Sequence, residues 1–158
     1  TMSDWANHLS TIFPEVRLKR FLEMRGGDVG GRDHIVAFSA FFVGLIYDQT
    51  ALDAAWDLVK GWSATERQQL RDDVPASGLD AAIEAVGLRE SARQALAISR
   101  HGLMRRDRRD ASGQTEAIHL DLLDARVASG RVAAQDWLDR FHGAWGGKVD
   151  PIFSEAAF

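Results

Sequence analysis

The feature that most constrains the fold of this chain is a change in the spacing of its apolar residues. Between residues 15 and 25, apolar and charged side chains alternate, and this period of two is typical of a β-strand with one apolar and one charged face. The alternation is imperfect, because Arg20 falls among the apolar positions and Phe21 among the charged ones. From residue 34 onwards the apolar residues follow helical spacings. We therefore predict a mainly α protein with one or two strands near its N-terminus.

The helices are predicted from apolar stripes and from capping residues. The clearest one, at residues 88–106, has a stripe at spacings of three and four that consists of Leu88, Ala92, Ala95, Leu96, Ser99 and Leu103. Ser63 and Glu66 have the spacing of a capping box, which predicts a helix that ends before Pro75. Further helices are expected before Pro14, at residues 34–48, 50–60, 79–85, 115–128 and 133–142, and for a last turn or two from Asp150.

The length of 158 residues and the 46% hydrophobic composition suit one globular domain. We find no repeat or linker, so residues 1–158 are predicted to form a single unit with a strand region at 15–25 and a helical region at 34–158. The most apolar stretch, residues 35–46, would span ~18 Å as a helix and is too short for a bilayer. It is expected to be a buried helix, and no membrane partner is predicted.

Several classes of function are excluded or disfavoured by composition. The net charge of −4 and the pI of about 5.7 give no reason to expect a nucleic-acid partner. The chain has no cysteine, which excludes disulfides, thiolate catalysis and cysteine-type zinc sites, and is compatible with the cytoplasmic location that we expect. No signal peptide opens the chain, and a first residue of Thr suggests that it was cut from something longer.

The charged face of the strand region is the first candidate site. Residues two apart on a strand project to the same side, so Glu23 and Arg25 would lie side by side, with Lys19 and Arg17 further along. A carboxylate that can hold Mg²⁺ beside a guanidinium that can bind phosphate suits phosphoryl transfer. The alternative is a solvated strand face with cross-strand ion pairs, which is common and which the pattern alone favours.

Two other patterns have a functional and a plainer interpretation. The glycine-rich residues 26–31 could wrap a phosphate, but they lack the ending of a P-loop and resemble a connector between strand and helix. A cluster of arginines could bind RNA or a nucleotide, but it falls at a predicted helix C-terminus, where positive charge is favoured, and we favour a solvated helix end. This arginine cluster consists of Arg100, Arg105, Arg106, Arg108 and Arg109.

Several runs of residues resemble, in family order along the chain, the plant and proteobacterial branch of the glutamate–cysteine ligases. These runs are residues 11–26, 41–48, 58–60, 70–75, 141–147 and 149–153. The resemblance implies an enzyme that joins the γ-carboxylate of glutamate to the amino group of cysteine in glutathione biosynthesis, with ATP and Mg²⁺ and through a γ-glutamyl phosphate. It also implies the C-terminal portion of an α+β fold similar to that of glutamine synthetase.

Particular roles follow from the resemblance. The Leu-Glu-x-Arg motif of the family matches residues 22–25, which implies that Glu23 is a magnesium ligand and that Arg25 is a catalytic contact to the phosphates. Arg17 and Lys19 belong to a shared Pro-Glu-Val-Arg-Leu-Lys run and are expected to help bind the nucleotide. Residues 32–34 depart from the Trp-Arg-Arg that we expect in the family, and Val36 stands where the family often has cysteine.

The enzymes of this family are much longer, and the resemblance implies that their first metal-binding carboxylates and most of their sheet lie upstream of Thr1. We therefore expect the missing N-terminal part of the same enzyme as a partner, glutamate and cysteine as substrates, and no ligation by this chain alone. A lone strand needs a partner, which would lie in the missing part unless the segment folds back on itself. The alternative is a free-standing, non-catalytic helical binding or regulatory module derived from the family, which the coding sequence upstream would distinguish.

Overall fold

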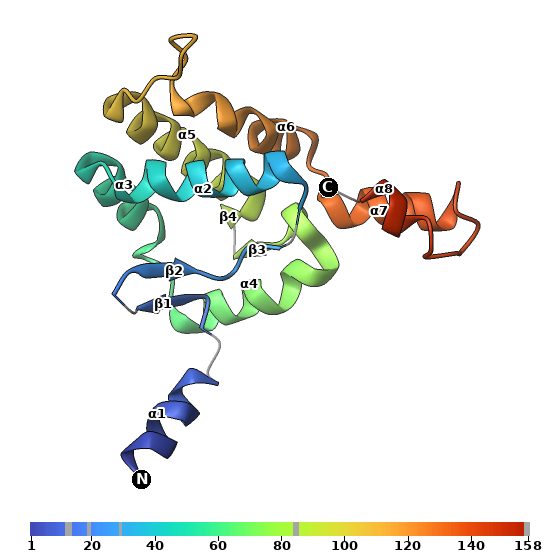
Figure 1. The fold of residues 1–158 in the computed structure, drawn as a ribbon, viewed down its shortest axis with the longest axis horizontal. Coiled ribbons are helices and arrows are strands. Elements are labelled where there is room, and N and C mark those ends of the chain that lie inside the picture. The colour runs from blue at the N-terminus through green and yellow to red at the C-terminus, as the bar shows by residue number, and fades with distance from the viewer. Residues whose placement is uncertain (12–13, 19, 29, 84–85, 157–158) are drawn as a thin grey trace. The chain divides into compact units, whose positions relative to one another are not determined.

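The fold is described from a computed structural model of the chain, which describes residues 1–11, 14–18, 20–28, 30–83 and 86–156 (Figure 1). The chain divides into two compact units, Thr1–Gly30 and Gly31–Phe158, and each is described by itself. The strand region predicted at residues 15–25 belongs to the first unit, and the helical region predicted at residues 34–158 belongs to the second. The grouping of both regions into one domain stays a prediction.

The first unit begins with helix α1 (Met2–Ser10), whose N-terminus is closed by a capping box. The Thr1 hydroxyl accepts a hydrogen bond from the backbone N–H of Asp4 at 3.2 Å, so Thr1 is the N-cap of the helix. The apolar side chains of Trp5 and Leu9 on this helix are exposed.

The strand region is a hairpin and not one continuous strand. Strand β1 (Val16–Leu18) pairs with β2 (Leu22–Met24) in antiparallel register. The prediction of a mainly α chain with one or two N-terminal strands is confirmed, and of the two alternatives for the segment it is the one in which it folds back on itself. One continuous strand over residues 15–25 was wrong, because backbone groups in the segment bond to one another across the hairpin. The irregular positions of Arg20 and Phe21 in the alternating pattern fall between the two strands and mark the place where the pattern is interrupted.

The second unit is built around the contact between α2 (Arg32–Ile46) and α5 (Leu88–Arg106). The helix predicted at 88–106 is confirmed with the same bounds, and the one predicted at 34–48 begins at Arg32 and ends at Ile46. Around this contact lie α3 (Gln49–Val59), the short 3₁₀ helix η2 (Glu116–Leu120) and α6 (Asp121–Ser129). The buried core residues of these elements are Ala40, Leu96, Leu103, Ala117 and Leu120.

The axes of α2 and α5 approach closely because glycines face each other at the crossing. A Cβ atom on Gly102 would lie 1.9 Å from the carbonyl oxygen of Gly44, so only glycine fits there. The Ser99 hydroxyl is fully buried and donates a hydrogen bond of 2.8 Å to the carbonyl oxygen of Phe41. This bond satisfies a buried polar group and ties the two helices together.

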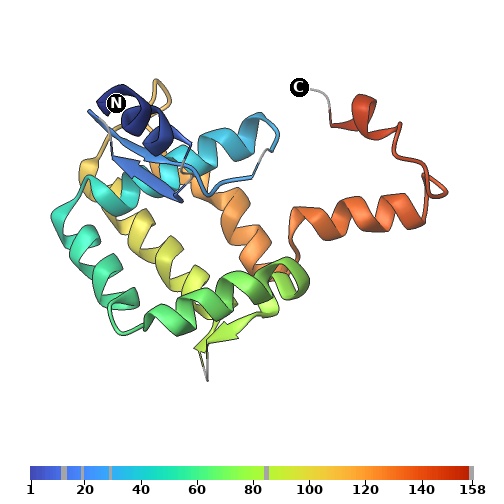
Figure 2. The same cartoon turned by 90° about the horizontal axis from the view of Figure 1, so that it is seen from below.

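Helix α4 (Ala64–Ser77) begins with the predicted capping box of Ser63 and Glu66. It does not end before Pro75, which lies inside its last turn, where the loss of one N–H donor removes a single helical hydrogen bond. The helix predicted at residues 79–85 is wrong in its described part. The 3₁₀ turn η1 (Gly78–Asp80) leads into strand β3 (Ala82–Ile83), which pairs with β4 (Val86–Gly87). Figure 2 shows this small hairpin beside α4.

The helix predicted at residues 115–128 is divided into η2 and α6, while α7 (Ala133–His142) matches its predicted bounds. A last helix, α8 (Ile152–Glu155), follows Pro151, near the place predicted for a final turn. Trp145 is buried, stacks on Trp137 with the ring centres 5.7 Å apart, and donates a hydrogen bond from Nε1 to Glu155 at 2.8 Å. These contacts hold α7, α8 and the glycine-rich turn between them together.

No single helix in the described part of the chain is long and apolar enough to cross a membrane. Helices α2 and α3 pass such a test only as a pair, by length and composition, and they are bent by 95° at the break between them. Helix α2 contacts α5 and buries Ala37, Ala40 and Gly44, but it is less buried than was expected, because Ile35 and Val36 are exposed and its other apolar side chains are only partly buried.

Candidate functional site

The charged face of the β1–β2 hairpin carries the predicted site residues. The register places Arg17 directly opposite Glu23, so Arg17 lies next to this carboxylate and not further along a single strand. The Arg17 guanidinium donates to Glu23 Oε2 from Nε at 2.8 Å and lies 2.7 Å from it through Nη2. Arg25, two residues along the strand, donates from Nη1 to Glu23 Oε1 over a longer distance of 3.3 Å. Glu23 is therefore held between two guanidinium groups.

The three side chains are half-buried, with exposed fractions of 23% for Arg17, 32% for Glu23 and 20% for Arg25. Partial burial reduces screening by water and orders the side chains, although pairs near a surface contribute only about 0–1 kcal/mol to stability. The cross-strand ion pairs expected under the alternative interpretation are thus present. The roles of Glu23 and Arg25 in binding magnesium and phosphate stay predictions, and Lys19 lies outside the described residues.

Glu15 is a second carboxylate at this hairpin that sequence reasoning did not single out. The Arg25 backbone N–H donates to the Glu15 carbonyl oxygen at 2.8 Å, which continues the pairing of the strands by one residue. A Cβ atom on Gly26 would lie 2.7 Å from Glu15 Oε2, so the glycine leaves room for this side chain. Glu15 lies two residues before Arg17, so the alternating pattern places both side chains on the same face. Had a hairpin been predicted, this pattern would have made Glu15 a candidate site residue.

The capacity of this face to hold a metal ion is limited. Among the described residues, no group of three or more acidic, histidine or cysteine side chains could ligate a metal. Magnesium is commonly bound through one or two carboxylates, with waters and substrate phosphates as further ligands. Glu23 fits a role as one such ligand, and its contact with Arg25 through Oε1, at 3.3 Å, is longer than its contacts with Arg17 through Oε2. A set of three or more protein ligands would need groups from outside the described residues.

The opposite face of the hairpin is apolar and open. Val16, Leu18 and Leu22 share this face and are 48%, 78% and 53% exposed, while Met24 is half-buried. Exposed apolar side chains in a contiguous patch are typical of surfaces that pack against another protein segment. A hairpin of two three-residue strands is also only marginally stable by itself.

The glycine-rich connector lies between β2 and α2. Gly31 is the N-cap of α2 and has an ordinary φ of −62°, and the described glycines of residues 26–31 do not adopt a left-handed conformation. Their backbone therefore resembles the extended connector of the plainer interpretation. Binding of a phosphate by this segment stays a prediction, and Val29 lies outside the described residues.

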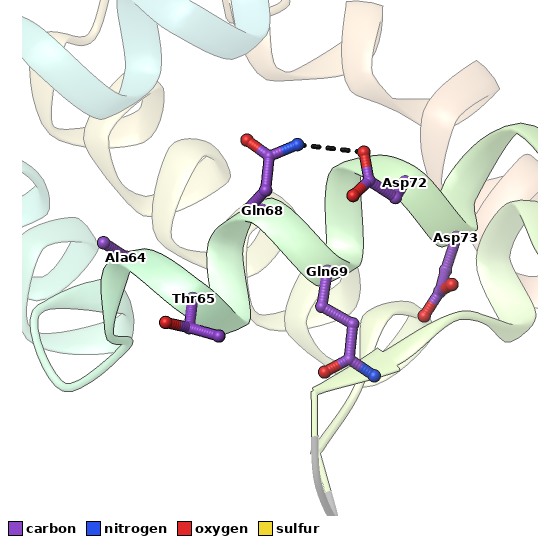
Figure 3. A pocket seen from close by; sticks show the side chains of 6 residues that line it. All are labelled: Ala64, Thr65, Gln68, Gln69, Asp72 and Asp73. Carbon is purple, nitrogen blue, oxygen red and sulfur yellow. Dashed lines mark hydrogen bonds between the residues drawn. The ribbon is translucent and has the colours of Figure 1, made fainter.

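A hollow in the described part of the structure lies elsewhere, along α4 (Figure 3). It has a volume of about 570 Å³ and is lined by Ala64, Thr65, Gln68, Gln69, Asp72 and Asp73. All of these residues come from a single helix, and Gln68 donates a hydrogen bond to Asp72 Oδ1 at 2.9 Å. This hollow contains none of the predicted site residues and no basic group, so it is not a candidate for binding phosphate.

Comparison with known proteins gives a match along nearly the whole chain. The family model described as glutamate–cysteine ligase family 2 matches residues 1–155. The chloroplastic glutamate–cysteine ligase of Nicotiana tabacum is 41% identical over 158 residues, which are 100% of this chain and 29% of that protein. The chloroplastic glutamate–cysteine ligase of Arabidopsis thaliana is 43% identical over 156 residues, 99% of this chain and 29% of that protein.

A third relative, the chloroplastic glutamate–cysteine ligase A of Oryza sativa subsp. indica, is 41% identical over 100% of this chain and 31% of its own length. The chain thus spans less than a third of the length of these relatives. Their names place the relatives in the chloroplast, and the cytoplasmic location expected for this chain stays a prediction.

Proposed function

Because this chain belongs to glutamate–cysteine ligase family 2, we propose that it is the C-terminal part of an ATP-dependent ligase of glutathione biosynthesis. In the proposed reaction, a γ-carboxylate oxygen of glutamate takes the γ-phosphoryl group of ATP and releases ADP. The amino group of cysteine then displaces phosphate from the γ-glutamyl phosphate, loses a proton and forms the amide bond. The observation that carries this proposal is the match of residues 1–155 at about 40% identity to ligases.

The proposed roles in this reaction fall to individual residues of the hairpin. Arg25 would bind the phosphates and stabilise charge that develops during phosphoryl transfer, as the catalytic residue of this chain. Glu23 would contribute one oxygen to magnesium, which would supply positive charge that neutralises the phosphates. Arg17, whose contacts to Glu23 are short, would keep that carboxylate oriented, and Arg17 and Lys19 would add positive charge near the nucleotide.

We propose the missing N-terminal part of the same enzyme as the partner that completes this site. Two observations support this: the chain covers only 29–31% of its relatives, and the apolar face of the hairpin is exposed. Glu23 and its arginines are too few to bind ATP, magnesium, glutamate and cysteine together. The isolated chain is therefore expected to be inactive.

A second candidate function is a non-catalytic helical binding module. It is favoured by one observation, namely that residues Gly31–Phe158 form a compact unit with its own buried core. Such a module would stay folded without the upstream part of the enzyme. It would use the helical surface for binding and leave the hairpin without a catalytic role.

Two activity measurements separate these candidates. In the first, the isolated chain is assayed for ATP- and cysteine-dependent formation of γ-glutamylcysteine, and clear turnover would contradict the proposed incompleteness. In the second, this chain replaces the 158 matching residues of the tobacco ligase. An active chimera is expected if the chain is an enzyme part, whereas a folded chimera without activity would favour the binding module.

A further inference from the structure

The arginine cluster at the end of α5 separates into two kinds of residue. Four of its five members make ion pairs: Arg100 with Asp121 and Asp124, Arg105 with Asp48, Arg106 with Glu116, and Arg109 with Asp107. The first three connect α5 to other segments, and the pair of Arg109 with Asp107 is local to the C-terminal end of α5. For these four, a structural role explains the positive charge. Arg108 differs, because its side chain makes no hydrogen bond or ion pair with any residue that the structure describes.

Arg108 lines a hollow of about 220 Å³ at the base of the loop that joins α5 to η2, the projecting loop before α6 in Figure 1. The other residues that line this Arg108 hollow are Arg109, Asp110, Gln114, Thr115, Glu116, Ile118 and His119. The side chains of Gln114, Thr115 and His119 make no hydrogen bond to a described residue. They add amide, hydroxyl and imidazole groups that can donate hydrogen bonds to the same space.

The loop around the hollow is held in one shape by its own backbone. Glu116 donates from its N–H to the Arg108 carbonyl oxygen at 3.3 Å, and Asp110 donates from its N–H to the Gln114 carbonyl oxygen at 2.9 Å. Inside the loop, Asp110 Oδ1 accepts hydrogen bonds from the N–H groups of Ser112 and Gln114 at 2.8 and 3.0 Å. The backbone that carries the side chains of the hollow is therefore ordered before any ligand arrives, which lowers part of the ordering cost of binding.

The acidic groups nearest to the hollow already have partners. Glu116 accepts from Arg106 at 3.1 Å, and Asp107 pairs with Arg109. Hydrogen bonds from Ser112, and then from Gln114, hold the pKa of Asp110 below its ordinary value, so this carboxylate stays ionised and turned to the loop backbone. Arg108 and Asp110 are the two charged side chains of the hollow that form no ion pair with a described residue, and Asp110 turns its Oδ1 to the loop backbone.

We propose that the Arg108 hollow binds a small oxyanion, a single phosphate or carboxylate group. Arg108 would supply the charge and a two-pronged set of donors, with Thr115 and His119 completing the contacts. The volume is below the 300–1,000 Å³ usual for larger ligands, so the site suits one anionic group and not a whole nucleotide. The site is independent of the hairpin and of the proposed ligase reaction.

The test is a titration of the isotopically labelled 158-residue chain, followed by NMR, with sodium phosphate, sodium acetate and sodium chloride at matched ionic strength. We expect saturable shifts at the Arg108 Nε–H and at the Thr115 and Glu116 amides with an oxyanion but not with chloride. Saturation by phosphate or by acetate supports the site and identifies the group it prefers. Shifts that grow alike and without saturation in all three salts would overturn the proposal.

Two variants separate this site from a general effect of positive charge. Arg108→Gln is expected to weaken oxyanion binding about tenfold, since it removes the charge-assisted contacts. The matched control is Arg105→Gln, which removes the same charge from the same cluster but at a residue that pairs with Asp48 outside the hollow. Affinity unchanged in Arg108→Gln, or reduced equally in both variants, would show that no specific site exists there.

Discussion

The hairpin unit and the helical unit of this chain differ in how far their side chains are buried and in where their paired charges lie. Among the described residues of Thr1–Gly30, none is buried, and the ordered charges lie on the half-buried face of Glu23 and its two arginines. In Gly31–Phe158, the core holds fully buried residues such as Leu103 and Leu120. In this unit, most arginines of the cluster form ion pairs that connect α5 to another segment.

This difference indicates where stability and function lie. The helical unit contains the buried apolar surface that makes folding favourable, and its ion pairs fasten neighbouring segments. The hairpin has little core of its own, and regions with few buried contacts are commonly those that bind or move. The family's site motif therefore falls in the part of this chain that depends most on additional contacts.

The largest expected effect tests the core of the helical unit. Leu103→Ala removes a side chain with no exposed surface and should lower the free energy of unfolding by about 4 kcal/mol, through lost burial and the cavity left behind. Urea unfolding measures the loss. Met104→Ala is the control, because this neighbour on α5 is 57% exposed and its loss should cost less than about 1 kcal/mol. Similar losses of unfolding free energy in both variants would contradict the view that buried residues of the helical unit provide its stability.

The next effect tests the hairpin through activity instead of stability. In the active chimera, Arg25→Ala should cost roughly 3–4 kcal/mol of transition-state stabilisation, since one charged donor to the phosphates is lost. Its unfolding free energy should change by less than about 1 kcal/mol, because the contact to Glu23 is partly exposed. Steady-state kinetics and urea unfolding check both parts.

The control for that experiment is Arg20→Ala, which removes an exposed arginine of the hairpin that lies outside the charged face. It should retain near-normal turnover. An Arg25→Ala enzyme that is as active as Arg20→Ala would refute the phosphate role. A large loss in the free energy of unfolding would show that Arg25 mainly stabilises the fold.

A smaller effect tests the crossing of α2 and α5. Gly102→Ala places a methyl group against the backbone of Gly44 and should destabilise the chain by about 2 kcal/mol, even though alanine favours helix formation. Thermal unfolding measures the change. Gly61→Ala, where a Cβ atom would meet nothing within 4 Å, should be neutral or slightly stabilising. An equally neutral Gly102→Ala would mean that the two helices are not tightly packed.

A still smaller effect tests the part of the helical unit that has no buried residues. Helix α4 depends on its capping box, in which Glu66 Oε2 accepts from the Ser63 N–H at 2.6 Å and Ser63 Oγ accepts from the Glu66 N–H at 3.2 Å. Ser63→Ala should cost about 1 kcal/mol, measured by chemical denaturation. Thr65→Ala, one residue inside the helix, should have almost no effect. If the two variants are alike, local capping does not stabilise α4.

The smallest effect concerns surface charge. Hydrogen bonds from Arg93, and then from Gln94, lower the pKa of Glu90 to about 2 from its ordinary value of 4.5. Because the pKa is lower in the folded chain, the stability that Glu90 contributes is complete above pH 4.5 and is lost as the pH falls towards 2. The thermal midpoints of the wild type and Glu90→Gln should differ slightly at pH 7 and converge near pH 2. A difference that persists at low pH would exclude this ion pair as its cause.

Much of the fold could be predicted because it rests on local patterns. The stripe from Leu88 to Leu103 predicted α5 with its observed bounds, and the spacing of Ser63 and Glu66 predicted the capping box. Predictions that needed a partner in space were weaker. Leu52 and Trp56 on α3 are apolar, yet they are 40% and 62% exposed, since the side of a helix that packs depends on neighbours far away in sequence.

The same division holds for the candidate site. The alternation of residues 22–25 by itself determined that Glu23 and Arg25 share one face, because side chains on a strand alternate between its two sides. Only the tertiary structure decided that the segment turns back on itself, that Arg17 lies opposite Glu23 on that face, and that Arg108, unlike the rest of its cluster, has no carboxylate partner among the described residues. Those outcomes depend on register and on contacts between distant residues, which local periodicity does not encode.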